Sequence, residues 1–223
     1  MEYTVTDADV KGPFVALPAK MEEQAKLDHL GYASLEEMLS ERFHMDESLL
    51  KALNPGKPLN KPGTTILVAN VGAEQGKGSK PAGALEKVTR IVVDKKFGEL
   101  QAYAKDGRMV AVYPASIGST ETPSPTGTHK VQTTAMNPTY TYKPEFKFAG
   151  VTADKPFTLK AGPNSPVGTV WIDLDTPSYG IHGTPAPEKV SKSASEGCVR
   201  LTNWDAEELA KLVSKGTIVE FGP

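Results

Sequence analysis

The strongest constraint on the fold is a change of pattern near residue 71 of the 223-residue chain. From about 71 to 87 the sequence reads VGAEQGKGSKPAGALEK, which is dominated by Gly, Lys, Ala and polar residues and has neither helical nor strand periodicity. Such a composition is typical of a linker. Helix signals stand before it, and short β-prone runs follow it. We therefore expect a small domain at 1–70, a linker at 71–88 and a larger domain at 89–223.

The first domain is predicted to be α+β, with the order β-α-α-β. Ser34 stands three residues before a glutamate, which is the spacing of a capping box that opens a short helix, and Asp46 can cap a second helix. β-prone residues at 3–5 and 64–68 provide the two strands. The residues from 7 to 31 show no regular period and are expected to be irregular.

The second domain is predicted to be mainly β. Short β-prone runs recur after the linker, and an Asp106-Gly107 pair favours a tight hairpin between two of them. The expected strands lie at 90–94, 99–104, 109–116, 128–133, 167–174, 179–182 and 217–221. One helix is expected at 204–214, because Thr202 and Asp205 have capping-box spacing and an apolar stripe follows them. A β-sandwich or a partly closed barrel accommodates this pattern.

Charge and composition exclude several classes of protein. The 25 basic and 27 acidic side chains nearly cancel, which gives no electrostatic basis for binding nucleic acid or a membrane surface. The longest apolar runs, 66–69 and 109–113, are far shorter than the roughly 20 residues of a membrane-spanning helix. One cysteine rules out an internal disulfide, and the four histidines lack metal-ligand spacing, so we expect neither a metal nor another cofactor.

The single cysteine, Cys198, lies in a segment that has the parts of a nucleophilic site. His182 ends a β-prone run upstream of this segment. A strand would hold its imidazole ring rigidly, so that the ring can act as a base for the thiol. Gly197 permits main-chain angles closed to other residues, so its N–H and that of Cys198 can face an oxyanion. Arg200 projects to the same face of an extended segment as Cys198, and its guanidinium matches a carboxylate.

Each of these residues also has a purely structural explanation. A lone cysteine is commonly a small buried hydrophobe, and an isolated histidine or arginine commonly serves packing or a surface ion pair. The occurrence of all three together favours catalysis. We expect Trp171 and Trp204 to lie in the core.

An aromatic cluster in the proline-rich stretch of the second domain has two explanations. Its four residues form either a lid over the site or hydrophobic anchors that pin a long loop. They are Tyr140, Tyr142, Phe146 and Phe148.

Two segments of the first domain, SLEEMLSERFHMDESLLKALNPG and LNKPGTTILVANV, follow each other as helix, helix and strand. In this order they resemble a LysM domain, a module that binds the N-acetylglucosamine sugars of peptidoglycan or chitin. About 28 residues separate the first strand from the first helix here, whereas the family has almost none. The resemblance therefore implies a LysM-like fold with an insertion, and we infer no sugar-binding residue from it.

Two motifs of the second domain, YGIHGT at 179–184 and SEGCVRL at 195–201, form a recognisable pair. Together they resemble the active-site signature of the L,D-transpeptidases, the YkuD catalytic domain, and the similarity extends over about 89–223. Glu196 stands where many members of the family have histidine. Because a carboxylate disfavours a neighbouring thiolate, we expect slower acylation than in a Glu196→His variant.

The resemblance implies a cysteine acyltransferase that acts on the tetrapeptide stems of peptidoglycan. A thioester forms with release of the terminal D-alanine, and the amine of a neighbouring stem completes a 3→3 cross-link. The implied catalytic residues are Cys198, His182 and Gly183, and the implied oxyanion or substrate-binding residues are Gly197, Ser195, Arg200 and Tyr140.

Several alternative functions stay open. An L,D-carboxypeptidase and a transferase that joins a protein to the stem share the acyl-enzyme step and differ only in the acceptor. A non-catalytic wall-binding protein is the alternative of another class, and a cytosolic thiol peptidase accords with the absence of a signal-peptide pattern at the N-terminus. The family implies the periplasm or cell envelope as location, peptidoglycan stem peptides and glycan strands as partners, and carbapenems as covalent inhibitors.

Overall fold

The computed structural model of the chain describes residues 1–71, 86–146, 151, 153–193, 195 and 197–222. The chain divides into two compact units, each described here by itself. The first unit comprises Met1–Lys80 and Thr141–Lys160, and the second comprises Pro81–Tyr140 and Ala161–Pro223. The linker predicted at 71–88 falls mainly on residues 72–85, which lie outside the described residues.

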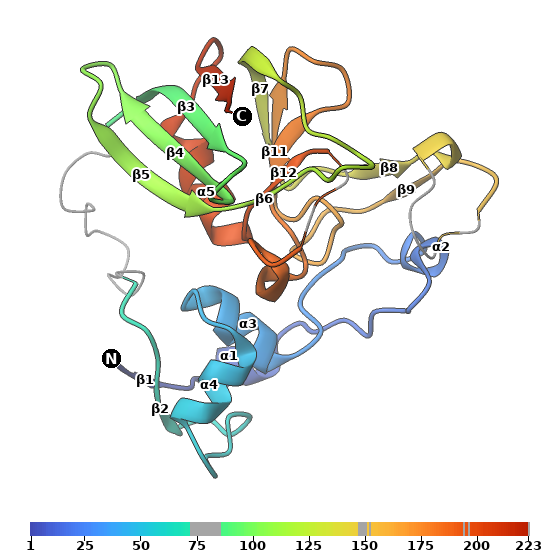
Figure 1. Ribbon diagram of the computed structural model, residues 1–223. Helices are drawn as coiled ribbons and strands as arrows, with labels where there is room; N and C mark the ends of the chain where they lie inside the picture. Colours follow the sequence, from blue (N-terminus) through green and yellow to red (C-terminus); the bar gives the residue numbers. More distant parts are fainter. Residues whose placement is uncertain (72–85, 147–150, 152, 194, 196, 223) are drawn as a thin grey trace. The chain divides into compact units, whose positions relative to one another are not determined.

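The N-terminal part of the first unit is a two-stranded sheet with helices between its strands (Figure 1). The elements are β1 (Glu2–Thr4), α1 (Asp7–Lys11), α2 (Met21–Gln24), α3 (Leu35–Arg42), α4 (Glu47–Leu53) and β2 (Thr65–Leu67). Strands β1 and β2 pair antiparallel, with Tyr3 opposite Ile66. The two predicted caps are present, since Ser34 Oγ accepts from Glu37 N and Asp46 Oδ1 accepts from Ser48 N. The predicted order of strand, helix, helix and strand is therefore present, with two further helices inserted.

These further helices, α1 and α2, contradict the expectation that residues 7–31 are irregular. Helix α1 begins with a capping box, in which Thr6 Oγ1 accepts from Asp9 N and the Asp9 carboxylate accepts from Thr6 N. A capping box satisfies two main-chain donors that are otherwise left without a partner at a helix start. The threonine–aspartate spacing is visible in the sequence, and it was the missed signal for this short helix.

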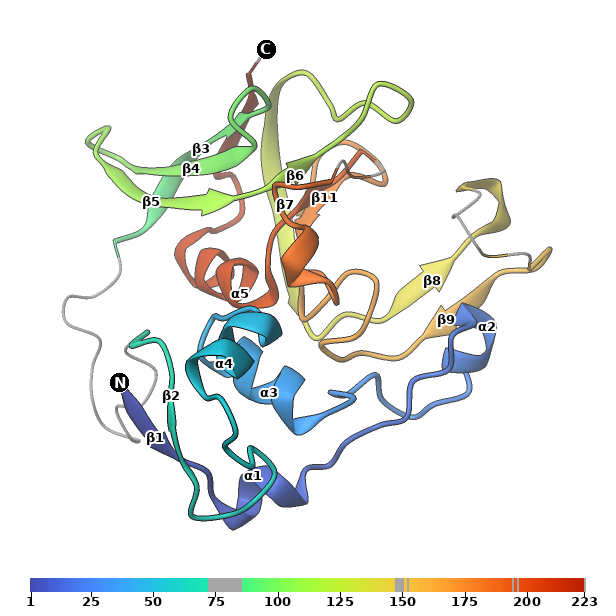
Figure 2. The same ribbon diagram turned by 60° about the horizontal axis from the view of Figure 1, so that its bottom comes forward.

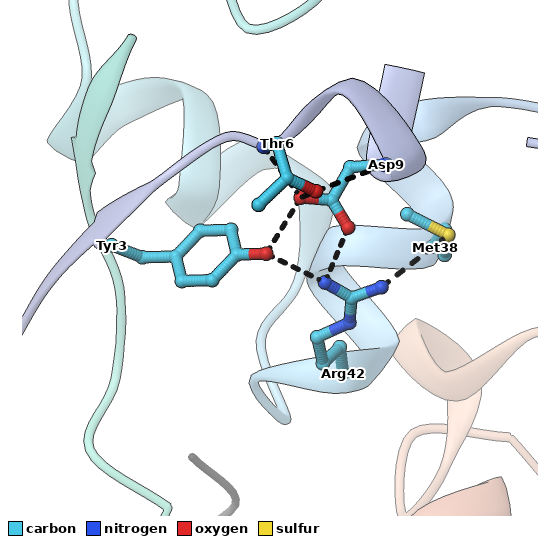
Figure 3. A network of polar contacts seen from close by, with 5 residues as sticks. All are labelled: Tyr3, Thr6, Asp9, Met38 and Arg42. Carbon is cyan, nitrogen blue, oxygen red and sulfur yellow. Dashed lines mark hydrogen bonds and ion pairs between the residues drawn. The ribbon is translucent and has the colours of Figure 1, made fainter. Parts of the chain in front are cut away.

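Asp9 also ties α1 to β1 and α3 (Figure 3). Its carboxylate accepts hydrogen bonds from Tyr3 Oη at 2.6 Å and from Arg42 Nη1 at 2.7 Å. Arg42 in turn donates to Tyr3 Oη at 2.9 Å and contacts the sulfur of Met38. Burial raises the pKa of Asp9, but the hydrogen bonds from Tyr3, Thr6 and Arg42 outweigh it and lower the pKa to about 2. The carboxylate is therefore ionised over the whole physiological range and holds three elements together.

An apolar cluster forms the core beneath these elements. The buried members are Val5, Leu35, Leu39, Phe43, Met45, Leu50, Leu59, Ile66 and Val68. They come from both strand ends and from the inner faces of α3 and α4. Burying one such side chain contributes about 1.5–3 kcal/mol, so this cluster is the main source of stability for the small sheet.

A second hairpin completes the first unit. Strand β8 (Tyr140–Tyr142) pairs with β9 (Phe157–Leu159), a short 3₁₀ helix (Pro144–Phe146) follows β8, and α2 packs against β9. The buried Tyr142 ring stacks on Phe157, with ring centres 5.0 Å apart. This contact favours the interpretation of Tyr142 as a hydrophobic anchor. Phe148 and the side chain of Phe146 lie outside the described residues.

The second unit is built on a nine-stranded sheet with the order β5-β4-β3-β13-β7-β10-β11-β12-β6. Its strands are β3 (Val88–Asp94), β4 (Glu99–Ala104), β5 (Met109–Pro114), β6 (Ser116–Ile117), β7 (Gly127–Met136), β10 (Val170–Leu174), β11 (Gly180–His182), β12 (Val199–Arg200) and β13 (Ile218–Phe221). The parallel pairs are β3 with β13 and β11 with β12, and the other neighbours are antiparallel. The prediction of a mainly β domain is confirmed.

The sheet is nearly closed, because its two edge strands follow each other in the chain. Strand β5 ends at Pro114 and β6 begins at Ser116, so only Ala115 separates the two edges. The long strand β7 pairs with β13 along its first half and with β10 along its second. Figures 1 and 2 show the resulting curl, with α5 (Asn203–Leu212) against its concave side. The prediction of a partly closed barrel is confirmed.

Helix α5 begins at the predicted cap, since Thr202 Oγ1 accepts from Asp205 N at 3.2 Å. Its buried residues, Ala206 and Leu209 among them, join the core of the sheet, and the helix packs against β10 and β11. A second 3₁₀ helix (Pro187–Lys189) lies between β11 and β12. Among the helices of the described residues, none combines the length and the apolar character that a membrane span requires.

Several strand predictions need correction, and β8 and β9 lie in a stretch where no strand was expected. The strand expected at 167–174 begins only at Val170, because Gly168 has a φ of +60° and closes a turn in which its N–H donates to Ser165 O at 2.8 Å. Strand β12 was not predicted, since two residues are too few for a visible period. It forms because its neighbours β11 and β6 hold it from both sides.

Candidate active site

Strands β11 and β12 lie side by side (Figure 1), and their parallel pairing brings three predicted residues onto neighbouring segments. His182 stands opposite Arg200 in the register, and Cys198 directly precedes β12. Paired residues, and residues two apart on an extended segment, project to the same face of a sheet. The imidazole, the guanidinium and the thiol therefore project from neighbouring strands toward one face.

The ring of His182 has a fixed tautomer. Its Nδ1 lies 2.6 Å from the carbonyl oxygen of Gly183. A carbonyl only accepts hydrogen bonds, so Nδ1 carries the proton and Nε2 has the free lone pair. Burial lowers the pKa of His182 to about 4; the Gly183 hydrogen bond raises it, and the positive charge of Arg200 lowers it further. At neutral pH the ring is thus an uncharged base with Nε2 as its accepting atom.

Trp171 covers one side of this ring. It is the register partner of His182 on β10, and the two rings stack with centres 5.5 Å apart and planes 20° apart. Its indole N–H donates to Asp173 at 3.1 Å. The expectation that Trp171 lies in the core is wrong, because a half-buried indole that flanks the imidazole belongs to the site. Gly180 makes room for it, since an added Cβ would lie 2.6 Å from the indole.

Cys198 has a partly exposed side chain, as a nucleophile requires. Its sulfur donates to the carbonyl oxygen of Ser178 at 3.7 Å. Ser178 itself has a φ of +68°, a left-handed conformation that is rare for a residue other than glycine. The thiol is therefore held by a strained turn and remains open to solvent.

Arg200 has one unsatisfied donor within the described part of the chain. Its Nε atom is buried there without a hydrogen-bond partner. A buried donor without a partner costs about 1–3 kcal/mol.

Gly197 is required by its backbone conformation and by its surroundings. Its φ of +105° is closed to other residues, and an added Cβ would lie 2.9 Å from the ring of Tyr179. Tyr179 Oη donates to Pro123 O at 3.5 Å, which holds the ring in place. Only glycine can therefore occupy position 197 without changing the backbone conformation that precedes Cys198.

The remaining predicted residues lie as follows. Ser195 is buried, and its hydroxyl donates to Cys198 O and accepts from Gly118 N, so it braces the turn that carries the thiol. Tyr140 begins β8, and its predicted contact with substrate stays a prediction. Glu196 lies outside the described residues.

Sequence reasoning missed Asn203, the first residue of α5. Its buried side chain accepts hydrogen bonds from Thr169 N and Thr184 N and donates one to Pro163 O. An asparagine directly after a helix-capping threonine was the available signal. Within the described residues, no group of three or more His, Cys, Asp or Glu side chains is arranged to hold a metal ion.

Comparison with known proteins gives a consistent result. The family model of the L,D-transpeptidase catalytic domain, YkuD, matches residues 88–221. The protein YkuD of Bacillus licheniformis, named as an L,D-transpeptidase, is 31% identical over 134 residues, which are 60% of this chain and 66% of that protein. The Bacillus subtilis protein YqjB, named likewise, is 32% identical over 135 residues, or 58% and 68% of the two chains.

Longer relatives match over the same part. YbiS of Escherichia coli K12 is 34% identical over 136 residues, which are 59% of this chain and 44% of YbiS. The matched region thus spans 66% of the Bacillus licheniformis YkuD protein and less than half of YbiS. A solved structure of L,D-transpeptidase 3 from Mycobacterium tuberculosis aligns with a TM-score of 0.49 and 18% identity, over 61% of each chain. The match to the family model covers more than half of the chain, and the protein therefore belongs to the YkuD family of L,D-transpeptidase catalytic domains.

Proposed function

We propose that the protein is an L,D-transpeptidase that remodels peptidoglycan. Its donor substrate is a stem tetrapeptide, whose third residue is acylated onto Cys198 with release of the terminal D-alanine. The acceptor is the side-chain amine of a neighbouring stem, and the product is a 3→3 cross-link.

The acylation step uses the neutral imidazole. His182 Nε2 accepts the thiol proton while the sulfur attacks the carbonyl carbon of the third residue. The N–H groups of Gly197 and Cys198 stabilise the resulting oxyanion, and each such donor typically lowers the barrier by about 2.7–4 kcal/mol. The C–N bond then breaks, and His182 returns its proton to the departing amine of D-alanine. The ring is again neutral, and a thioester remains.

Deacylation repeats these steps with a new nucleophile. The acceptor amine attacks the thioester carbonyl and gives a proton to His182. The C–S bond breaks, and the protonated imidazole restores the thiol. Water in place of the amine yields a tripeptide, which is the L,D-carboxypeptidase reaction, and an amine on a protein yields a protein–peptidoglycan conjugate.

Substrate positioning falls to the polar groups around the thiol. Arg200 offers its guanidinium group to a carboxylate of the stem peptide. Ser195 acts through the main chain of Cys198, which it holds by a hydrogen bond. Tyr140 contributes an aromatic wall. The first unit acts as a LysM-like module for glycan strands, and the protein works in the periplasm or cell envelope, where this polymer lies.

One observation carries the proposal: the register of β11 and β12 places His182 and Arg200 side by side, with Cys198 one residue before β12. A wall-binding protein without catalytic activity has no need of a partly exposed thiol that leads into the strand paired with a neutral base of fixed tautomer.

The test combines intact-mass measurement with product analysis. The parent protein is expected to gain the mass of a carbapenem, to release D-alanine from a disaccharide-tetrapeptide and to form a 3→3 dimer. The Cys198→Ala variant is the control and is expected to do none of these. Accumulation of tripeptide alone would assign the carboxypeptidase reaction, and the absence of any adduct on the parent would favour the non-catalytic binding protein.

A further inference from the structure

Asn203 links three segments of backbone at the base of the catalytic face. It is the first residue of α5 and only 2% exposed. Its Oδ1 accepts from Thr169 N at 3.2 Å and from Thr184 N at 3.1 Å, and its Nδ2 donates to Pro163 O at 3.1 Å. The amide thus connects the turn before β10, the start of β10 and the loop after β11.

The bond to Thr184 acts on the same peptide group that orients His182. The N–H of Thr184 and the carbonyl of Gly183 belong to one planar unit, and no described peptide bond is cis. Asn203 holds the N–H end of this unit, and the carbonyl end accepts from His182 Nδ1 at 2.6 Å. Because a trans peptide directs its N–H and its carbonyl to opposite sides, a rotation of the plane breaks both hydrogen bonds together.

The packing around this peptide leaves room for the asparagine and for little else. A Cβ added to Gly183 would overlap Asn203 Oδ1, and so would one added to Gly168. Gly183 is therefore a glycine because the amide fills the space where a side chain would stand.

We propose that Asn203 is the positioning residue of the catalytic base, holding the 183–184 peptide so that the Gly183 carbonyl keeps His182 in its Nδ1–H tautomer. The inference rests on the proposed function, in which Nε2 takes the proton of Cys198. Without Asn203, the peptide can turn and the ring can take the other tautomer, which presents a donor to the thiol in place of an acceptor. Loss of a comparable orienting group in other sites costs roughly tenfold to 10⁴-fold in rate, and we expect a fall of about tenfold to hundredfold here.

The experiment measures the tautomer and the rate separately. Proteins labelled with ¹⁵N-histidine report the tautomer of His182 from the ring nitrogen signals, and stopped-flow acylation by a carbapenem reports the rate. Asn203→Ala is expected to lose the pure Nδ1–H signal and to acylate ten to a hundred times more slowly. Thr202→Ala is the matched control, because it weakens the cap of the same helix by about 1 kcal/mol and leaves the asparagine amide in place.

The outcomes separate positioning from stability and from the proposed function. An unchanged tautomer and rate in Asn203→Ala would overturn the inference, and so would an equal loss in Thr202→Ala. Should Asn203→Ala fail to fold, Asn203→Asp decides: its carboxylate loses the hydrogen bond donated to Pro163 O but still accepts from Thr169 N and Thr184 N at a helix start, so it is expected to keep the Nδ1–H tautomer. A parent protein that does not acylate would refute the proposed function alone, because the tautomer measurement needs no turnover.

Discussion

The acidic limit of acylation follows directly from the burial of His182. The reacting pair is a thiol and a neutral imidazole, so the rate at low pH follows the neutral fraction of the ring. With the pKa lowered to about 4, about 90% of the ring is neutral at pH 5, whereas an unperturbed histidine would be only about 3% neutral. The enzyme is therefore expected to keep most of its pH 7 acylation rate at pH 5, where an exposed histidine would lose about 25-fold.

Arg200 supplies the internal test of this reasoning. Its positive charge lowers the pKa of His182, so removing the charge must raise the pH at which acylation is half-maximal. Arg200→Gln is expected to shift that midpoint upward, and Arg200→Lys, which keeps the charge, is expected to leave it nearly unchanged. A loss of substrate affinity changes the amplitude or the concentration dependence of the rate, but it does not move the midpoint.

The assay is single-turnover acylation by a carbapenem from about pH 3 to pH 8, with near-ultraviolet circular dichroism at each pH to confirm the fold. A midpoint near 6.5 in the parent protein would refute the assignment of a buried, neutral base. Equal midpoints for the parent and Arg200→Gln would refute the electrostatic contact between the two strands.

Three further predictions concern stability and backbone shape. Asp9→Asn is expected to lower the free energy of unfolding of the first unit by about 1–2 kcal/mol at pH 7. The parent protein is expected to lose the same amount as the pH falls from about 4 through 2, because the folded state lowers the pKa of Asp9. Equal urea midpoints of the two proteins at pH 7 would contradict this prediction. Burial raises the pKa of Asp205 to about 6, so the stability of the folded protein falls as the pH rises through 6. The free energy of unfolding of Asp205→Asn should therefore exceed that of the parent by about 1–2 kcal/mol at pH 8 and equal it at pH 4. The same difference at both pH values would exclude ionisation of the carboxylate as the cause. Gly197→Ala is expected to slow acylation more than about tenfold, because strain at the positive φ and the clash of the new Cβ with Tyr179 displace the Cys198 amide. A normal acylation rate would mean that this amide has no part in the oxyanion site.

Local signals allowed much of the fold to be predicted. The Asp106-Gly107 pair lies between β4 and β5 as expected, and Thr202, Ser34 and Asp46 cap their helices. These features depend on residues within four positions of one another, and such spacings are visible in a single sequence. Helix α1 obeys the same rule through Thr6 and Asp9, so it was predictable as well.

The parts that escaped prediction depend on distant contacts. Strand β12 exists because β11 and β6, which lie far from it in the sequence, supply its hydrogen bonds. Trp171 lies beside His182 because of the register between β10 and β11, which no periodicity fixes in advance. Asn203 acts on a peptide group nineteen positions away. The motif identified the thiol and the imidazole, whereas the residues that orient them are known only from the folded chain.

The most direct measurement is the mass of the proteolytic peptide that contains Cys198, taken after the protein is mixed with a stem tetrapeptide and quenched in acid. A gain equal to the tetrapeptide minus D-alanine, located on that sulfur and at least tenfold less abundant in Asn203→Ala at the same early time point, is the expected result. An unmodified thiol in a protein that still releases D-alanine, or an acyl group found on another residue, would contradict a mechanism in which this sulfur and the imidazole of His182 work as a pair.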